Sequence, residues 1–144
     1  MFYSGHWVFF PWPELWQTEE IMRDITFLEL VPIVLALYLF KNELSLKIIM
    51  FHTDNKALVT IVNKKSSKSK RVMQLIRPLV LHTMLWGMHV KACHISGRSN
   101  CIADAISGKQ WDRLRKEAPA ADMVPLEIPQ SFRRLISELK LTDL

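Results

Sequence analysis

The longest hydrophobic stretch of the chain runs from Ile25 to Phe40 and contains only one charged residue, Glu29. Within it, Leu28, Val31 and Leu35 recur at helical spacing, and the pattern predicts a helix that continues to about residue 42. Thr26, with Glu29 three residues later, has the spacing of a capping box at the start of this helix. Because apolar residues occur nearly all round it, we expect the helix to be buried against a sheet.

Three segments have the composition of strands. Residues 46–52 and 89–95 are predicted to be two buried strands, and residues 6–10 form a β-prone run that ends at Pro11 and Pro13. Amphipathic helices are predicted between the two buried strands, over residues 57–62 and from Val72 to about Trp86, where Gly87 ends the second one. Strands alternating with helices predict an α/β fold in which parallel strands are joined by right-handed crossovers.

The character of the chain changes after residue 107. A short helix over 101–106 is followed by a charged helical turn over 111–117, a segment punctuated by three prolines, and a small amphipathic helix over 132–141. We therefore divide the chain into an α/β domain, residues 1–107, and a linker with a short C-terminal helix, residues 108–144.

Composition and charge narrow the classes of protein. The run Ile25–Phe40 is shorter than the roughly 20 residues that a membrane span needs, and no secretory leader is recognisable at residues 1–7. The five tryptophans are expected to pack inside the protein. Two cysteines, Cys93 and Cys101, favour a reducing, intracellular compartment. Whether that compartment is the nucleus or the cytoplasm is left open.

The net charge of +5 arises in one place. Between residues 64 and 71 the chain has five basic and no acidic residues, and in the rest of the chain the basic and acidic residues balance. This run predicts a flexible, sequence-independent contact with nucleic-acid phosphates. A solvated loop and a nuclear-localisation signal are the alternatives. The basic residues are Lys64, Lys65, Lys68, Lys70 and Arg71.

Three carboxylates have apolar surroundings in the sequence or lie at the end of a predicted strand: Glu29, Asp54 and Asp104. Each has an ordinary alternative role, which is the capping box for Glu29, the N-cap of the next helix for Asp54, and a solvent-facing helix position for Asp104. Strand ends and helix starts can converge at one edge of an α/β sheet, where ligands usually bind. Three carboxylates there would suit Mg²⁺.

Three segments, in this order, resemble the ribonuclease H (RNase H) domain of retroelement polyproteins, most closely the DIRS-type elements, over about residues 7–107. They are Phe27–Leu37 (FLELVPIVLAL), Phe51–Ala57 (FHTDNKA) and His94–Ser107 (HISGRSNCIADAIS). The resemblance implies a ribonuclease H-like mixed sheet flanked by helices, and hydrolysis of the RNA strand of an RNA–DNA hybrid with Mg²⁺, or Mn²⁺ in its place. It implies that Glu29, Asp54 and Asp104 are catalytic metal ligands.

The resemblance also implies contacts and partners. Asn100 matches an asparagine that precedes the last aspartate of the family, and Arg98 lies near the position of a mobile histidine; with Asn55 they are predicted nucleic-acid contacts. Residues 115–122 resemble the segment that these elements place between RNase H and a tyrosine recombinase. The remainder of a reverse transcriptase polyprotein is therefore an expected partner.

One family carboxylate has no counterpart. The first aspartate of these enzymes lies on the opening strand of the sheet, whereas this chain has no Asp or Glu before Glu14, and residues 7–10 resemble the third family strand. We therefore expect a domain that lacks the first strands, and weak or absent hydrolysis. The alternatives are a non-catalytic nucleic-acid-binding or assembly module and a non-functional retroelement remnant.

Overall fold

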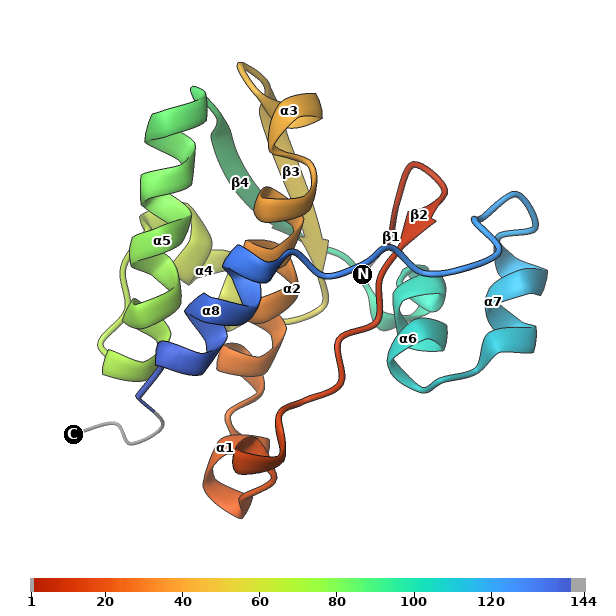
Figure 1. Ribbon diagram of the computed structural model, residues 1–144, viewed down its shortest axis with the longest axis horizontal. Helices are drawn as coiled ribbons and strands as arrows, with labels where there is room; N and C mark the ends of the chain where they lie inside the picture. Colours follow the sequence, from red (N-terminus) through yellow and green to blue (C-terminus); the bar gives the residue numbers. More distant parts are fainter. Residues whose placement is uncertain (1, 141–144) are drawn as a thin grey trace.

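The computed structural model describes residues 2–140 and has a mixed α/β architecture, as the sequence predicts (Figure 1). The strands are β1 (Phe2–Tyr3), β2 (His6–Trp7), β3 (Ile48–Thr53) and β4 (His89–His94). The α-helices are α1 (Glu19–Arg23), α2 (Ile25–Leu39), α3 (Lys41–Leu44), α4 (Lys56–Lys64), α5 (Lys70–Trp86), α6 (Cys101–Ser107), α7 (Trp111–Glu117) and α8 (Gln130–Glu138). Short 3₁₀ turns span Glu14–Trp16 and Gly97–Ser99.

The two predicted strands form the expected parallel pair, but the prediction that they are buried is wrong, since Ile48 is 72% and Met50 46% exposed on β3, and His89 and Lys91 of β4 are exposed. β3 and β4 align with Ile48 opposite His89 and Thr53 opposite His94. The connection between them contains α4 and α5, and α2 packs against α5. The parallel pairing that the strand–helix order predicted is therefore confirmed, and the carboxyl ends of both strands lie at the same edge.

The N-terminal strand is shorter than predicted and does not join this sheet. β2 pairs only with β1, in an antiparallel hairpin whose turn residues Ser4 and Gly5 both have positive φ angles, 50° and 83°. Such a turn matches the twist of a tight hairpin. Residues 8–10, predicted to extend the strand, have no regular structure, and Val8 packs into the main core instead. In the described part of the chain the expected single mixed sheet is thus two separate two-stranded sheets.

Helix α2 forms the centre of the main core, as its apolar sequence predicts. Phe27, Leu30, Val34 and Leu37 are completely buried. The predicted capping box is wrong, because the helix begins one residue earlier than Thr26 and Asp24 caps it: the Phe27 N–H donates to Asp24 Oδ1 at 3.1 Å. An aspartate side chain outside the helix can satisfy that free N–H as well as a threonine can.

Polar side chains cap the N-termini of α4 and α5, and a glycine ends α5. Asn55 caps α4 by accepting from the Leu58 N–H at 3.1 Å, and Ser69 caps α5 by accepting from the Val72 N–H at 3.3 Å. Gly87 ends α5 with a φ of 64°, a conformation that glycine adopts without strain. The predicted end of α5 is confirmed.

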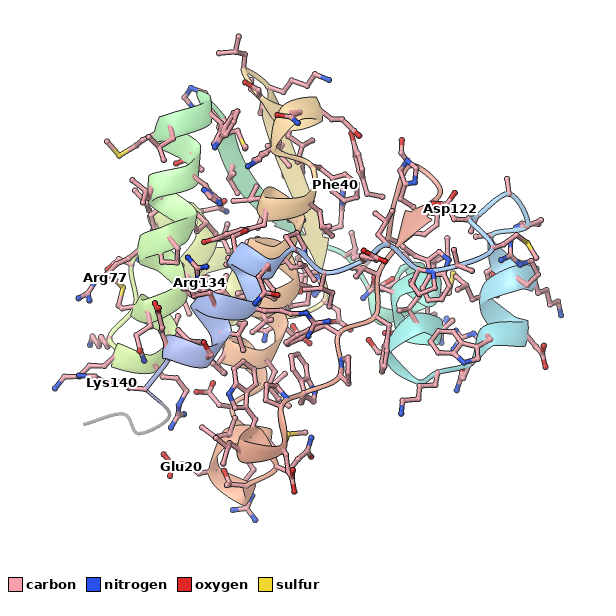
Figure 2. The ribbon with its side chains drawn as sticks, in the orientation of Figure 1. Glu20, Phe40, Arg77, Asp122, Arg134 and Lys140 are labelled. Atoms are coloured by element: carbon pink, nitrogen blue, oxygen red, sulfur yellow. The ribbon has the colours of Figure 1, made fainter. Side chains whose placement is uncertain are left out.

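The segment after residue 107 is not a free linker. Leu114 of α7 packs with Trp7 and Ile106 in a second, smaller core, and Phe132 of α8 is completely buried in the main core. The chain between these helices returns to the N-terminal hairpin, beside which Asp122 lies (Figure 2). There the Trp7 indole donates to the Asp122 carbonyl at 2.8 Å. The boundary of a family-like domain at residue 107 stays a prediction. Residue 141, the last residue of the predicted C-terminal helix, lies outside the described residues.

Two of the five tryptophans are buried, in line with the packing role expected of them, namely Trp7 and Trp16. Trp111 is 43% exposed, but its ring lies 5.2 Å from that of Trp7. Among residues 2–140, none of the helices has the length and apolar character that crossing a bilayer requires.

Candidate functional site

The candidate site lies at the carboxyl edge of the parallel pair. Asp54 directly follows β3 and is exposed, and the loop that follows β4 lies beside it. A Cβ placed on Gly97 in this loop would be 3.6 Å from Asp54 Oδ2. The parallel arrangement of β3 and β4 thus brings two segments more than 40 residues apart to one place.

Glu29 of α2 completes this edge. Its Oε2 accepts a hydrogen bond from Thr53 Oγ1 at 3.4 Å, which ties α2 to the end of β3. Burial raises the pKa of Glu29, and the negative charges of Asp54 and Asp104 raise it further, although hydrogen bonds from Asn55 and Thr53 act in the opposite direction. Asp54 and Asp104 therefore lie close enough to Glu29 for their charges to act on it.

The structure decides between the alternatives for these carboxylates. Glu29 is not part of a capping box, because Asp24 caps α2. Asp54 is not the N-cap of α4, because Asn55 has that role. Asp104 does occupy a solvent-facing position in the first turn of α6. Glu29 and Asp54 are thus left without the local structural roles that could have explained them.

The donor chemistry of the three side chains fits Mg²⁺, but their spacing does not form a finished metal centre. Carboxylate oxygens are the ligands that Mg²⁺ prefers. Within residues 2–140, however, no group of three or more His, Cys, Asp or Glu side chains is close enough to hold a metal ion.

The raised pKa of Glu29 predicts that this carboxylate costs stability. Above the raised pKa the side chain is charged in the folded protein, where burial and two neighbouring carboxylates penalise the charge; unfolding relieves that penalty. We expect Glu29→Gln to increase the free energy of unfolding at pH 7, and the difference from wild type to shrink as the pH falls through the raised pKa toward the ordinary value of 4.5.

Urea unfolding followed by tryptophan fluorescence at pH 7 and pH 4 measures this effect. Glu43→Gln, at an exposed position of α3, is the matched control and should change stability little at either pH. A Glu29→Gln protein that is less stable than wild type at pH 7 would contradict the assignment of Glu29 to a cluster of repelling carboxylates.

Four of the five predicted basic contacts are exposed: Lys64, Lys65, Lys68 and Lys70. Lys64 is the last residue of α4, and Lys65 ends that helix in the left-handed conformation with a φ of 56°. We call these four residues the basic segment. They connect α4 to α5 on the surface, where phosphate contacts are possible.

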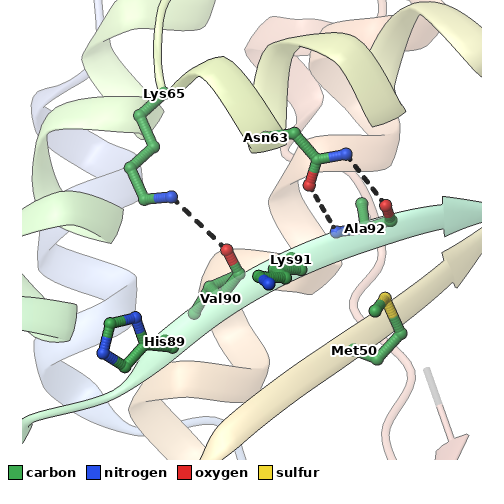
Figure 3. Close-up of a pocket in the computed structure, with 7 residues that line it drawn as sticks. All are labelled: Met50, Asn63, Lys65, His89, Val90, Lys91 and Ala92. Atoms are coloured by element: carbon green, nitrogen blue, oxygen red, sulfur yellow. Dashed lines mark hydrogen bonds between the residues drawn. The ribbon is translucent and has the colours of Figure 1, made fainter.

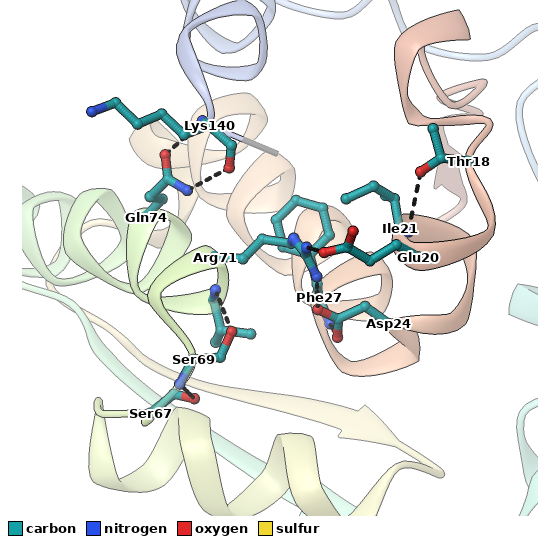
Figure 4. A network of polar contacts seen from close by, with 11 residues as sticks. Thr18, Glu20, Ile21, Asp24, Phe27, Ser67, Ser69, Arg71, Gln74 and Lys140 are labelled. Atoms are coloured by element: carbon teal, nitrogen blue, oxygen red, sulfur yellow. Dashed lines mark hydrogen bonds and ion pairs between the residues drawn. The ribbon is translucent and has the colours of Figure 1, made fainter. Parts of the chain in front are cut away.

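Arg71 does not belong with them, and its prediction as a flexible phosphate contact is wrong. Its side chain is only 5% exposed; Nη1 donates to Asp24 Oδ2 at 2.8 Å and Nη2 to Glu20 Oε1 at 2.6 Å (Figure 4). The guanidinium also lies 6.0 Å from the centre of the Phe27 ring. A planar group with several donors can bridge two carboxylates in this way. Arg71 therefore fastens α5 to the start of α2.

The side chains of the remaining predicted nucleic-acid contacts, Asn55, Arg98 and Asn100, differ in accessibility. The Asn55 amide is used within the chain, since Oδ1 caps α4 and Nδ2 donates to Thr26 Oγ1 at 3.4 Å. Arg98 is exposed in the 3₁₀ turn beside Asp54, and Asn100 is half-buried at the start of α6. Of these three, Arg98 has the most accessible side chain.

Thr53 is a site residue that the sequence analysis missed. It is 8% exposed, and its hydroxyl holds Glu29 and also accepts from the Asn55 N–H at 3.2 Å. Its position directly before Asp54, as the last residue of a strand, was the signal that could have identified it.

Comparison with known proteins provides no further guide to this site. No protein-family model, no curated protein and no solved structure matches the chain.

Proposed function

We propose that this chain is an RNase H-like, nucleic-acid-binding domain of a retroelement polyprotein, which contacts RNA–DNA hybrids and hydrolyses them weakly or not at all. The observation that carries the proposal is that Glu29, which is tied to the end of β3 by Thr53, lies near enough to Asp54 and Asp104 for their charges to raise its pKa. These are the three acidic positions for which the resemblance implies a catalytic role.

The basic segment supports a binding role. It begins at the end of α4 opposite to Asp54, and a helix of nine residues is about 13 Å long. A strand of nucleic acid with phosphates about 3.4 Å apart along the helix axis covers that length in about four steps. One hybrid laid along α4 can therefore reach both the carboxylate edge and the basic segment.

Hydrolysis is expected to be weak because this chain has counterparts of three of the four carboxylates that the family uses. The resemblance implies Mg²⁺ or Mn²⁺ at these positions, but within residues 2–140 the three carboxylates do not form a group that could hold such an ion. Without a bound cation, the negative charges of Glu29 and Asp54 at this edge repel phosphate. Binding through the basic segment is thus the better supported part of the function.

We expect glutamine at all four positions of the basic segment to weaken hybrid binding at least tenfold. It should also reduce the slope of log affinity against log salt, by about 0.9 for each phosphate that the protein no longer neutralises. Fluorescence anisotropy with a labelled RNA–DNA hybrid at several salt concentrations measures both quantities. Glutamine at Lys116, Arg133, Arg134 and Lys140, which are exposed on or next to α7 and α8, removes the same charge elsewhere and is the matched control.

A cleavage assay with the same hybrid, in Mg²⁺ and in Mn²⁺, tests the remaining part. Little or no hydrolysis is expected. Robust cleavage that Asp54→Asn abolishes would contradict the expected weakness and would support the family assignment. Binding that is absent, or that the control variant weakens as much as the basic-segment variant, would overturn the binding function.

A further inference from the structure

The outer edge of β4, away from β3, is covered by a side chain instead of a strand. Asn63 of α4 donates from Nδ2 to the Ala92 carbonyl at 3.0 Å and accepts from the Ala92 N–H at 2.8 Å (Figure 3). Its amide thus makes both bonds that a neighbouring strand would make with this residue. This pair of bonds holds α4 beside β4 and creates a corner between them.

A pocket of about 220 Å³ occupies that corner, and we call it the α4–β4 pocket. Lys65 extends into it from the end of α4, while His89 and Lys91 line it from β4 (Figure 3). Its lining contains two ammonium groups and one imidazole and no carboxylate. The pocket is therefore cationic although most of the chain is electrically balanced.

A backbone donor also faces the pocket. N–H groups along a strand alternate between its two edges. Because the His89 N–H donates to Lys47 on the β3 side and the Ala92 N–H bonds Asn63 on the outer side, the Val90 N–H points to the outer edge. Within residues 2–140 no acceptor for it is found, while the Val90 carbonyl accepts from Lys65 Nζ at 3.4 Å. Val90 is 1% exposed, so this donor favours a bound acceptor.

We propose that the α4–β4 pocket binds one phosphate group of a nucleic-acid backbone, with Lys65 and Lys91 supplying positive charge and the Val90 N–H donating a hydrogen bond. His89 donates a further hydrogen bond from its ring. This inference rests on the proposed nucleic-acid-binding function and adds a fixed anchoring point to it. Lys65 belongs both to the basic segment and to the α4–β4 pocket. A nucleic-acid backbone that follows the basic segment therefore leads into the pocket.

The geometry explains why a phosphate suits this corner. The donors come from two directions, the end of α4 and the edge of β4, and a phosphate has several oxygens that can accept from both. A carboxylate side chain of the same chain would neutralise the pocket, but none lines it. Lysine contacts of this kind recognise charge and not base identity.

Two single substitutions test the pocket without altering the basic segment. Lys91→Gln is expected to weaken hybrid binding about fivefold and to lower the salt slope by about one, and His89→Gln is expected to weaken binding by a smaller factor. Lys116→Gln on α7 and His52→Gln on β3 are the matched controls, because both positions are exposed and lie outside the pocket. Neither control should change the affinity.

Titration with inorganic phosphate, followed by the amide NMR signals of Val90 and Lys91, separates the pocket from the wider function. The pocket is supported, even if no hybrid binds, when phosphate causes chemical-shift changes that saturate and these changes are absent in Lys91→Gln. Salt-dependent hybrid binding that is unchanged in Lys91→Gln, with no shift at Val90, overturns the pocket and leaves the proposed function standing. Phosphate shifts combined with unchanged hybrid binding overturn the assignment to nucleic acid. Failure of both measurements overturns both proposals.

Discussion

Replacing Arg71 with alanine is expected to lower the free energy of unfolding by about 3–5 kcal/mol. The guanidinium is buried, and it bridges Asp24 and Glu20 at the point where α5 meets α1 and α2. Its removal leaves Asp24, which is 22% exposed and caps α2, without its cationic partner. Glu20 is 66% exposed, so its pair with Arg71 contributes less. Urea unfolding followed by tryptophan fluorescence measures the loss.

Lys70→Ala is the matched control, because the neighbouring side chain is exposed and its removal should change stability by less than about 0.5 kcal/mol. The double variant Arg71→Met with Asp24→Asn should recover part of the loss, since methionine fills the space and asparagine still caps the helix. An Arg71→Ala protein with wild-type stability and weaker hybrid binding would return Arg71 to the group of phosphate contacts.

Phe132→Ala is expected to cost about 3–5 kcal/mol, the usual range for removing a buried phenylalanine. The Phe132 ring is completely buried and packs edge-on against Phe10, at 5.6 Å between ring centres, and Tyr38, at 5.7 Å. The side chain thus joins α8 to α2 and to the segment after the N-terminal hairpin. A loss of this size would show that residues after 107 contribute to the main core.

Arg133→Ala, at the next and exposed position of α8, is the control and should leave stability nearly unchanged. A small effect of Phe132→Ala would indicate that α8 is a dispensable attachment to the domain. The urea unfolding curve of the wild-type protein also tests the remnant alternative. A single cooperative transition would contradict a non-functional remnant that cannot fold.

The parallel strands and the two helices between them could be predicted from sequence because their signals are local. The apolar run of residues 46–52 predicts most of β3, and the spacing of Leu75, Ile76 and Leu79 together with Gly87 predicts α5 and its end. Alternation along β4, with His89 and Lys91 outside and Val90 and Ala92 inside, was also present in the sequence. That alternation was the available signal for the α4–β4 pocket, but it does not reveal that Lys65 lies beside it.

The carboxylate edge could be anticipated for a topological reason. Parallel strands place their carboxyl ends together, so Asp54 and the loop after β4 had to meet once the strands paired. The capping roles of Asp24 and Asn55 could not be distinguished from those expected of Thr26 and Asp54 by spacing alone. Neighbouring polar residues compete for the same few N–H groups. A shift of the helix start by one or two residues decides which of them caps the helix.

By itself, the sequence determined the segments that form the parallel strands β3 and β4 and the helices α4 and α5 between them, and that the excess positive charge is concentrated at residues 64–71. Only the tertiary structure decided which of those charges face solvent. Lys70 and Arg71 are adjacent in the chain, yet Lys70 is exposed while Arg71 meets Asp24, 47 residues away, inside the fold. The physical reason is that burying a charge is favourable only beside a partner, and the partner's position depends on how distant helices pack.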